Sequence, residues 1–145
     1  MLDYTDYDTR LAAYAVVVDD AERVLLALWN EPAEPLWTLP GGGVDLGERV
    51  EDGCVREVRE ETGYDVALGR LLGVDTAVIE PGRRRVETAR PLQAVRIFFE
   101  ARVTGGTLTR ELDGTTDEAR WFPLAEVPDL PRVAMVDTAL GLVGR

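Results

Sequence analysis

One short helical segment constrains the fold of this chain more than any other stretch. Its residue pattern predicts a helix over about residues 48–62, and Gly63 follows at the position of a left-handed C-terminal cap. Glu57, Glu60 and Glu61 fall within five positions of this helix. Like charges four positions apart on a helix repel each other by about 0.2–0.5 kcal/mol per pair, so the cluster needs a physical reason.

Helical geometry indicates what the three glutamates can do together. A helix advances by about 100° per residue, so their carboxylates project within an arc of roughly 100°. Val50, Cys54 and Val58 form an apolar stripe beside that arc, which places the carboxylates at the edge of a packed surface. A hard divalent cation prefers several oxygen ligands and would turn the repulsion into a binding site. The alternative is a solvated acidic face, neutralised in part by Arg56 and Arg59, which is the commoner role of a Glu-rich helix.

The composition limits the chemistry further, because the sequence contains no His, no Ser and no Lys. Without His there is no imidazole base and no His-bound zinc site. Without Ser there is no Ser-based triad, and Cys54 has no His to activate it. Without Lys, a Walker-type phosphate loop and a Schiff base are both excluded. Any hydrolytic chemistry therefore has to use carboxylates, arginines, backbone groups and metal ions.

The charge balance indicates which partners to expect. The 27 acidic and 16 basic residues give a formal net charge of −11, which disfavours binding to nucleic acid polymers and to anionic membranes. No apolar run approaches the roughly 18 residues of a membrane span, and the acidic N-terminus lacks the apolar region of a secretory signal. Cys54 is the only cysteine, which excludes an intrachain disulfide and fits a reducing compartment. We expect a cytoplasmic location.

The 145 residues predict one domain over positions 1–145, with strands and two helices in an α/β layered arrangement. The turn over residues 19–22 reads as a hairpin, and three glycines after Pro40 predict an irregular segment. Phe98 interrupts the polar face of its strand and is a candidate for either the pocket or a dimer contact. The predicted strands cover residues 15–18, 23–29, 37–39, 64–79, 92–104 and 119–122; a helical turn at 123–128 and a helix at 131–143 follow.

The stretch Gly42–Tyr64 resembles the Nudix box. That box runs Gly, five of any residue, Glu, seven of any, Arg-Glu, an aliphatic, any, Glu-Glu, any, Gly, and a hydrophobic residue. The matching positions are Gly42, Glu48, Arg56, Glu57, Val58, Glu60, Glu61, Gly63 and Tyr64. The preceding W37-T-L-P-G-G also resembles the usual entry to the box, whereas Tyr64 stands where an aliphatic residue is commoner. The resemblance covers 23 of the 145 residues.

The resemblance implies an α/β/α sandwich with a mixed β-sheet, and hydrolysis of a nucleoside diphosphate linked to another group X with the help of Mg²⁺ or Mn²⁺. It implies that Glu57, Glu60 and Glu61 are metal ligands or the general base. The carbonyl of Gly41 would complete the metal shell. The implied ion pair of Arg56 with Glu48 would brace the helix against the preceding loop. The implied catalytic residues are therefore Glu48, Arg56, Glu57, Glu60 and Glu61.

Substrate contacts have to come from outside the box. Many members of the family it resembles carry a basic residue just after the second strand, but this chain has Leu-Trp-Asn at 28–30, so the resemblance does not supply that phosphate contact. With no Lys available, arginine is the side chain that can clamp a phosphate. Each candidate also has an alternative, non-functional interpretation: the charged residues can be solvated side chains of a surface loop, and the tryptophan can be a structural aromatic. The candidates are Trp29, Arg83, Arg84, Arg85, Asp117 and Glu118.

The sequence supports three functional hypotheses. The first is a metal-dependent pyrophosphohydrolase that acts on a small-molecule nucleotide, with (d)NTP or oxidised nucleotides favoured over ADP-ribose, nucleotide sugars or dinucleoside polyphosphates. The second is a non-catalytic nucleotide-sensing module of the same fold, which would be expected to have a degraded box. The third, a calcium-binding structural protein, lacks the loop spacing of an EF-hand. A homodimer is left open.

Overall fold

The computed structural model describes residues 1–109 and 116–145, without the side chains at positions 116 and 117. The elements are, in chain order, β1 (Asp8–Val17), β2 (Arg23–Trp29), β3 (Leu36–Thr38), β4 (Gly41–Gly43), α1 (Val50–Thr62), β5 (Tyr64–Ile79), the 3-10 turn η1 (Pro81–Arg83), β6 (Leu92–Gly106), β7 (Thr116–Pro123), the 3-10 turn η2 (Leu124–Asp129) and α2 (Ala134–Leu142). The strands and helices predicted from the sequence are therefore confirmed, with shifted ends. None of the described helices is long and apolar enough to cross a membrane.

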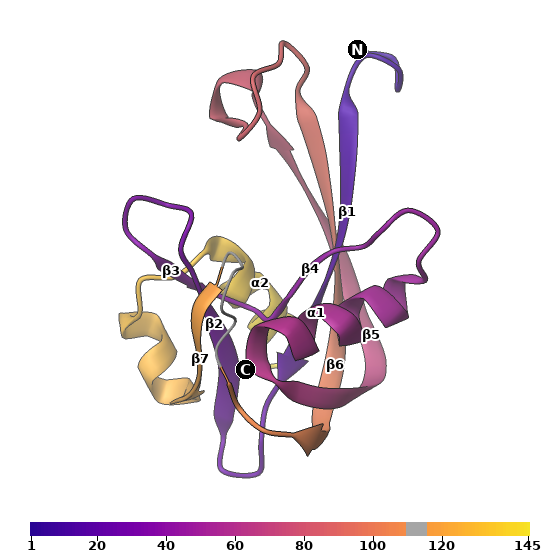
Figure 1. Ribbon diagram of the computed structural model, residues 1–145. Helices are drawn as coiled ribbons and strands as arrows, with labels where there is room; N and C mark the ends of the chain where they lie inside the picture. Colours follow the sequence, from indigo (N-terminus) through magenta and orange to yellow (C-terminus); the bar gives the residue numbers. More distant parts are fainter. Residues whose placement is uncertain (110–115) are drawn as a thin grey trace.

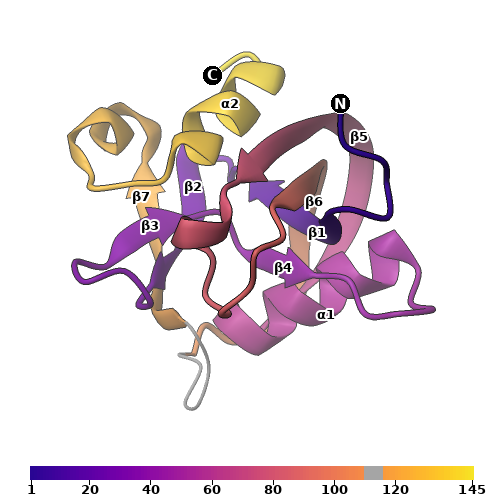
Figure 2. The same cartoon turned by 90° about the horizontal axis from the view of Figure 1, so that it is seen from above.

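The strands form two sheets, which Figure 1 shows from the side. The larger sheet has the strand order β4-β1-β6-β5, and the smaller one has the order β3-β2-β7. β1 pairs parallel with β6, whereas β5 pairs antiparallel with β6, so the larger sheet is mixed. Seen from above, α1 and α2 lie on opposite sides of the strands (Figure 2). This layering confirms the predicted α/β class and the sandwich arrangement.

The turn between β1 and β2 forms as predicted, but the two strands do not make an ordinary hairpin. The Asp19 carboxylate accepts hydrogen bonds from the backbone N–H groups of Ala21 and Arg23, which holds the turn closed. An isolated bridge joins Val18 to Val24, and beyond it each strand runs in a different sheet. The turn therefore connects the two sheets and lets a pocket open between them.

The prediction of an irregular segment at the three glycines was wrong. Gly41–Gly43 forms β4, which pairs antiparallel with β1 at the sheet edge. Gly41 has φ 142°, and a Cβ there would lie 2.3 Å from the Ala13 carbonyl oxygen and 2.6 Å from the Tyr14 Cα. Glycine is needed for this close approach to β1, because any other residue would meet backbone atoms and adopt a strained φ. Glycine here permits a strand that composition alone argued against.

Helix α1 ends as the sequence predicted, and its apolar stripe is buried. Gly63 adopts φ 81°, the left-handed conformation, and its N–H bonds to the Arg59 carbonyl. Cys54 and Val58 are fully buried under the helix, against one face of the larger sheet. The prediction that Cys54 serves packing is confirmed. The burial of this stripe fixes the rotation of α1, and hence the direction in which its glutamates point.

The opposite face of the larger sheet has a second core, and this corrects the prediction for Phe98. Its side chain is completely buried rather than exposed in the pocket or at a dimer contact. The polar face predicted for β6 is covered at this point by residues from the smaller sheet and from α2, such as Leu26, Phe122 and Leu140. Alternation along one strand could not reveal that both of its faces are covered.

Candidate active site

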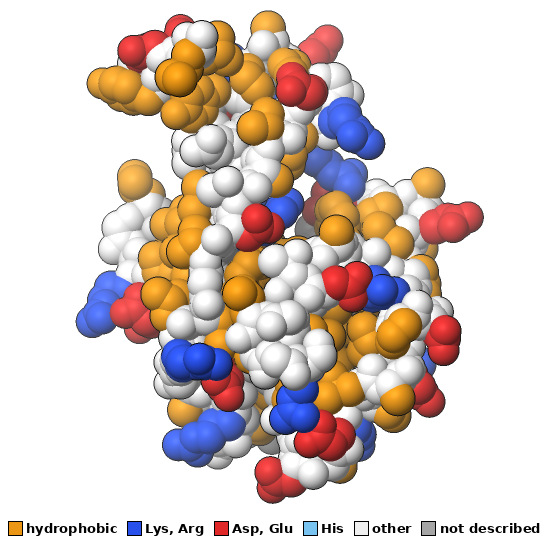
Figure 3. All heavy atoms as spheres, turned by 180° about the vertical axis from the view of Figure 1, so that it is seen from behind, with side chains coloured by type: hydrophobic (Ala, Val, Ile, Leu, Met, Phe, Trp, Pro, Cys, Tyr) orange, Lys and Arg blue, Asp and Glu red, His pale blue; other side chains and the backbone are white. Residues whose placement is uncertain are grey.

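A large pocket opens where the upper part of the larger sheet separates from the smaller sheet. Its volume is about 620 Å³, within the range of roughly 300–1,000 Å³ typical of small-molecule sites. From behind, several arginine side chains lie beside a hollow between the narrow upper part of the molecule and its wider lower part (Figure 3). The pocket is lined from β1, β2, β4, α1, β5, β6, the loop after β5 and the start of α2.

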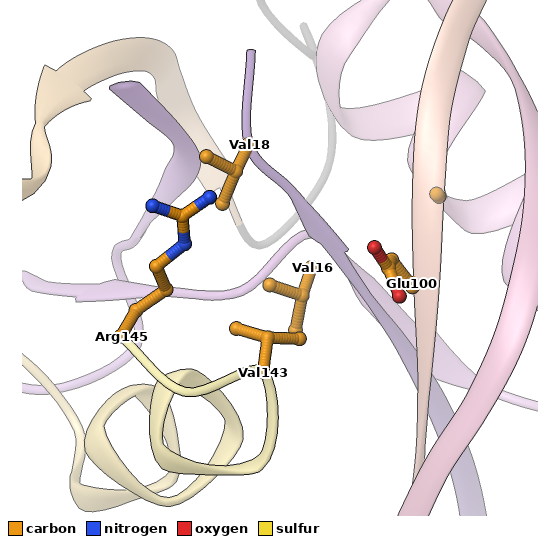
Figure 4. A pocket seen from close by; sticks show the side chains of 6 residues that line it. Val16, Val18, Glu100, Val143 and Arg145 are labelled. Atoms are coloured by element: carbon orange, nitrogen blue, oxygen red, sulfur yellow. The ribbon is translucent and has the colours of Figure 1, made fainter. Parts of the chain in front are cut away.

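A second, smaller cavity lies at the other end of β1, beside the C-terminal segment. It has a volume of about 110 Å³, and Figure 4 shows the side chains of Val16, Val143 and Arg145 around it. This is well below the size of nucleotide-binding sites, and none of the residues predicted for the active site lines it. The large pocket is therefore the candidate active site.

One side of the large pocket is acidic, and it is built from α1 and β4. The Glu61 side chain is buried (6% exposed), and one of its carboxylate oxygens accepts a hydrogen bond of 3.0 Å from the Gly41 N–H. Glu57 packs on Gly42 so closely that a Cβ there would lie 2.8 Å from its carboxylate oxygen. Both glutamates and all three glycines line the pocket. We name Glu57, Glu61 and Gly41–Gly43 the acidic wall.

The predicted ion pair between Arg56 and Glu48 is present, and Arg56 binds several further groups. Its Nε and Nη2 donate to the two Glu48 oxygens, each at 2.9 Å, in a bidentate pair. Nη2 also donates to the Gly43 carbonyl at 3.1 Å, and Nη1 contacts Glu57 Oε1 at 3.1 Å. Arg56 thereby ties α1 to β4 and to the loop before α1. The hydrogen bonds from Arg56 lower the pKa of Glu48 to about 2, and Glu48 in turn raises the pKa of Arg56.

Glu60 lies differently from the other two glutamates. Its side chain is about half exposed, and both of its oxygens contact Arg56 Nη1, at 3.2 and 3.3 Å. It is not among the side chains that line the pocket. The structure therefore brings Glu57 and Glu61 to the pocket and places Glu60 beside them on Arg56, whereas helical geometry alone had predicted three converging carboxylates.

Cys54 lies directly behind the acidic wall and provides no nucleophile. Burial raises the pKa of its thiol to about 12, and the nearby charges of Glu61 and Glu57 contribute to that shift. A thiol with this pKa stays protonated near neutral pH and is unreactive. The chemistry of the pocket is accordingly left to its carboxylates and to whatever they bind.

The donors of the acidic wall fit a magnesium-like ion. Across residues 1–109 and 116–145, no three His, Cys, Asp or Glu side chains come close enough to make a metal cage by themselves. Mg²⁺ rarely uses such a cage; it is usually bound by one or two carboxylates together with waters and substrate phosphates. Glu57 and Glu61 supply two oxygen-donor groups beside open pocket volume. This set suits Mg²⁺ better than Ca²⁺, which takes six to eight ligands.

Five arginines line the pocket, and we name them the arginine side: Arg10, Arg83, Arg84, Arg85 and Arg96. The triplet at 83–85 was predicted from the sequence. Arg84 binds Asp8 at 2.7 Å, and together with Arg90 it holds the pKa of that carboxyl below its ordinary value. Arg85 binds the Glu31 carboxylate at 2.9 Å. These pairs connect the loop after β5 to β1 and to the loop after β2, across the mouth of the pocket.

Arg10 on β1 and Arg96 on β6 were missed as site residues. Arg10 is the only arginine of β1, and for Arg96, which shares β6 with Arg102, the alternation of the strand indicated only a polar face. One sequence pattern could have identified Arg10 as a site residue: it shares a strand face with the small Ala12 and the aromatic Tyr14. Such a pattern marks a cation directed over the floor of a sheet.

The remaining predicted contacts differ in where they lie. Trp29 lines the pocket, stacks with the Arg85 guanidinium at 5.5 Å and donates its indole N–H to Glu31. Glu118 is not among the pocket-lining residues and pairs with Arg120 at 2.6 Å. Asp117 belongs to β7, but its side chain is outside the described part of the structure. Trp29 is therefore the strongest of these three candidates.

Comparison with known proteins identifies the class. A model of the NUDIX domain matches residues 8–138. The chain is 45% identical to a putative 8-oxo-dGTP diphosphatase of Bacillus subtilis, over 83% of this chain and 74% of that protein. It is 33% identical to an ADP-ribose pyrophosphatase of Methanocaldococcus jannaschii, over 83% of this chain and 65% of that protein. A NUDIX hydrolase structure from Nitrosomonas europaea has the same fold, with a TM-score of 0.78, 22% identity, and coverage of 94% of this chain and 89% of that one.

The chain therefore belongs to the Nudix family. It is an enzyme of the Nudix pyrophosphohydrolase class, which hydrolyses acid anhydrides. The two relatives are named for different substrates, 8-oxo-dGTP and ADP-ribose. They therefore share the type of reaction, but not the substrate.

Proposed function

We propose that this enzyme hydrolyses a nucleoside diphosphate linked to X with the help of Mg²⁺ or Mn²⁺, and that (d)NTPs or oxidised nucleotides are its substrates. The observation that carries the proposal is the convergence of the acidic wall, the arginine side and Trp29 on one pocket. We infer that residues 1–145 act as one Nudix domain. A cytoplasmic location and a homodimer remain predictions.

Glu57 and Glu61 would hold the cation, with the Gly41 carbonyl as a further donor and Glu60 as a candidate ligand or base. When bound, such a cation neutralises phosphate oxygens and lowers the pKa of a bound water. Residues of the chain itself orient the carboxylates and accept the proton. The Gly41 N–H orients Glu61, and Arg56 positions Glu57 while it braces the helix. A carboxylate of the acidic wall can accept the proton of the attacking water.

Nucleotide binding would use the other side of the pocket. Because the chain has a net charge of −11, phosphates can bind only where cations offset that charge. Arginine is the only residue type in this sequence with a cationic side chain. Trp29 offers a flat face against which a base can stack, with Met135 and Val133 adding apolar lining. The name of the 45% identical relative supports an oxidised guanine nucleotide, and that of the second relative keeps ADP-ribose as the alternative.

A substrate panel tests the proposal. The enzyme would be assayed with dGTP, 8-oxo-dGTP, ADP-ribose and a dinucleoside polyphosphate, each with Mg²⁺, Mn²⁺ or EDTA, and release of phosphate and pyrophosphate would be measured. We expect the highest kcat/KM on a triphosphate and no turnover in EDTA. Full turnover in EDTA would overturn the metal requirement, and preference for ADP-ribose would overturn the substrate assignment. Binding without turnover of any compound would instead favour the nucleotide-sensing module.

A further inference from the structure

We propose that Arg10 and Arg96 form an anion subsite on the pocket floor, which binds a phosphate carried by the group X. The substrate would then be a nucleotide with further phosphates beyond the cleaved bond, as in a nucleoside triphosphate, rather than one whose X is a neutral sugar. This inference rests on the proposed function and specifies the substrate class of that site.

The register of β1 and β6 places both arginines on one face of the larger sheet. β1 and β6 are parallel, with Arg10 opposite Ala94 and Arg96 opposite Ala12. Residues opposite each other share a sheet face, so both arginines rise from the same face, two positions apart on neighbouring strands. Both alanines are buried in the floor and are too small to fill the space between the guanidinium groups. The result is two cations with an open floor between them, which suits a phosphate.

The members of the arginine side differ in how closely they are paired with carboxylates. Arg84 and Arg85 are held by close carboxylates, at 2.7 and 2.9 Å, as described above. Arg96 has only a longer contact with Asp75, at 3.7 Å. For Arg10, no ion pair is found in the part of the chain that the structure describes. Arg83 also has no ion pair in the described residues, but it lies in the turn after β5 rather than on the floor strands. Arg10 and Arg96 are thus less neutralised than Arg84 and Arg85, and an incoming phosphate would not have to displace a close carboxylate from them.

Strand β4 connects this subsite to the acidic wall. The Nη2 of Arg10 lies 3.3 Å from where a Cβ of Gly43 would be, while Glu57 packs on the neighbouring Gly42. Successive residues of a strand face opposite ways, so Arg10 and Glu57 flank β4 from its two faces, and both line the pocket. Because β4 consists of glycines, no side chain separates the two groups. A phosphate chain can lie across this edge, with one phosphate at the acidic wall and the next at Arg10.

The charge of the pocket floor also favours one class of X over another. No basic residue follows β2, where the sequence reads Leu-Trp-Asn at 28–30. Arg10 supplies a cation from β1 instead. A neutral sugar in the place of X would leave the two guanidinium groups without an anionic partner, whereas a phosphate would satisfy them. The charge of the floor therefore selects a phosphate-bearing X.

The binding test needs neither the metal nor turnover. Inorganic tripolyphosphate would be titrated calorimetrically into the full chain in EDTA, comparing wild type with Arg10→Ala, Arg10→Lys and Arg96→Ala. We expect about 10- to 100-fold weaker binding for each alanine variant, the loss of one charge-assisted contact, and partial recovery for Arg10→Lys. Arg70→Ala is the matched control, because Arg70 is an exposed β5 residue that pairs with Glu100 outside the pocket. Equal binding by wild type and both alanine variants would overturn the subsite.

Steady-state kinetics give the second readout. In Arg10→Ala, KM for a nucleoside triphosphate should rise about tenfold or more with kcat nearly unchanged, while KM for ADP-ribose should stay the same. An equal rise for both substrates would overturn the assignment of X. If the wild-type enzyme hydrolyses none of the substrates, but the Arg10→Ala variant binds tripolyphosphate more weakly than wild type, the proposed function fails and the subsite stands. If hydrolysis is normal and tripolyphosphate binding is unchanged in the variants, only the subsite fails.

Discussion

The two sides of the pocket differ in how the chain builds them. The acidic wall comes from one continuous stretch, β4, a short loop and α1, in which helical spacing sets the positions of the glutamates. The arginine side is assembled from β1, β6 and the loop after β5, segments up to 86 positions apart between Arg10 and Arg96. The positions of the two glutamates of the acidic wall on α1 are consequently determined locally. The arginine side depends on how the two strands pair, and there sequence variation can change the substrate without disturbing the catalytic geometry.

The largest expected effect is at the acidic wall. Glu61→Gln should lower kcat by about 10²–10⁴-fold, because the neutral amide neither attracts a cation nor accepts the proton of water. The fold should survive, since the amide oxygen can still accept the Gly41 N–H. Steady-state kinetics with saturating Mg²⁺ would measure the loss.

Glu51→Gln is the matched control for that substitution. Glu51 is also on α1, but it pairs with Arg49 near the start of the helix and does not line the pocket. It should keep wild-type kcat. If Glu61→Gln is as active as Glu51→Gln, the assignment of catalysis to the acidic wall is wrong.

The second prediction separates two neighbouring glycines. Gly41→Ala should reduce the free energy of unfolding by about 3 kcal/mol, because its Cβ meets backbone atoms of β1 at an unfavourable φ. Gly42→Ala should unfold near the wild-type midpoint, because its Cβ meets only the flexible end of Glu57. Displacement of that carboxylate should nevertheless lower kcat by about 10²-fold. Denaturant unfolding and initial rates would measure the two effects.

Two results would contradict the predicted difference between Gly41→Ala and Gly42→Ala. A Gly42→Ala variant with full activity would show that Glu57 can move without consequence and would shift the catalytic role to Glu61 or Glu60. Equal destabilisation of both alanine variants would mean that the packing of Glu57 on β4 contributes to folding as much as the backbone approach at Gly41 does.

The smallest expected effect concerns pH. The pKa of Glu48 is depressed from about 4.5 to about 2 in the folded chain by its hydrogen bonds with Arg56. The stabilisation from this pair is therefore complete above about pH 4.5 and is lost as the pH falls towards 2, where the carboxylate becomes protonated. In Glu48→Gln, stability should fall less steeply over this interval. Thermal unfolding from pH 6 to pH 2 would measure the difference, with the exposed Glu34→Gln as the control. Parallel curves for wild type and Glu48→Gln would show that the pair contributes nothing to the acid transition.

Most of the acidic wall could be predicted from the sequence, and the reasons are local. The apolar stripe with Cys54 and Val58 determines which side of α1 is buried, and the glutamates follow from the helical repeat. Gly63 ends the helix by its own conformational freedom. The pairing of Arg56 with Glu48 was available only from the family resemblance, because the two residues are eight positions apart and Glu48 lies in the loop before α1.

Other features required the tertiary structure. Strand alternation could not predict that Phe98 is buried, because the cover comes from β2, β7 and α2. Glu60 pairs with Arg56 and does not line the pocket, which helical geometry alone could not predict. Composition predicted an irregular segment at Gly41–Gly43, and only pairing with β1 made it a strand.

The sequence by itself determined the α/β class, the helix with its three glutamates, and a chemistry limited to carboxylates, arginines and metal ions. It could do so because these properties depend on composition and on positions only a few residues apart. The tertiary structure alone decided which two glutamates enter the pocket and which arginines face them. Strand pairing brings Arg10 and Arg96 onto one floor across 86 positions, and no local pattern encodes that register. The proposed catalytic residues of this Nudix hydrolase therefore lie in one segment of its chain, whereas the proposed phosphate subsite depends on how distant strands pair.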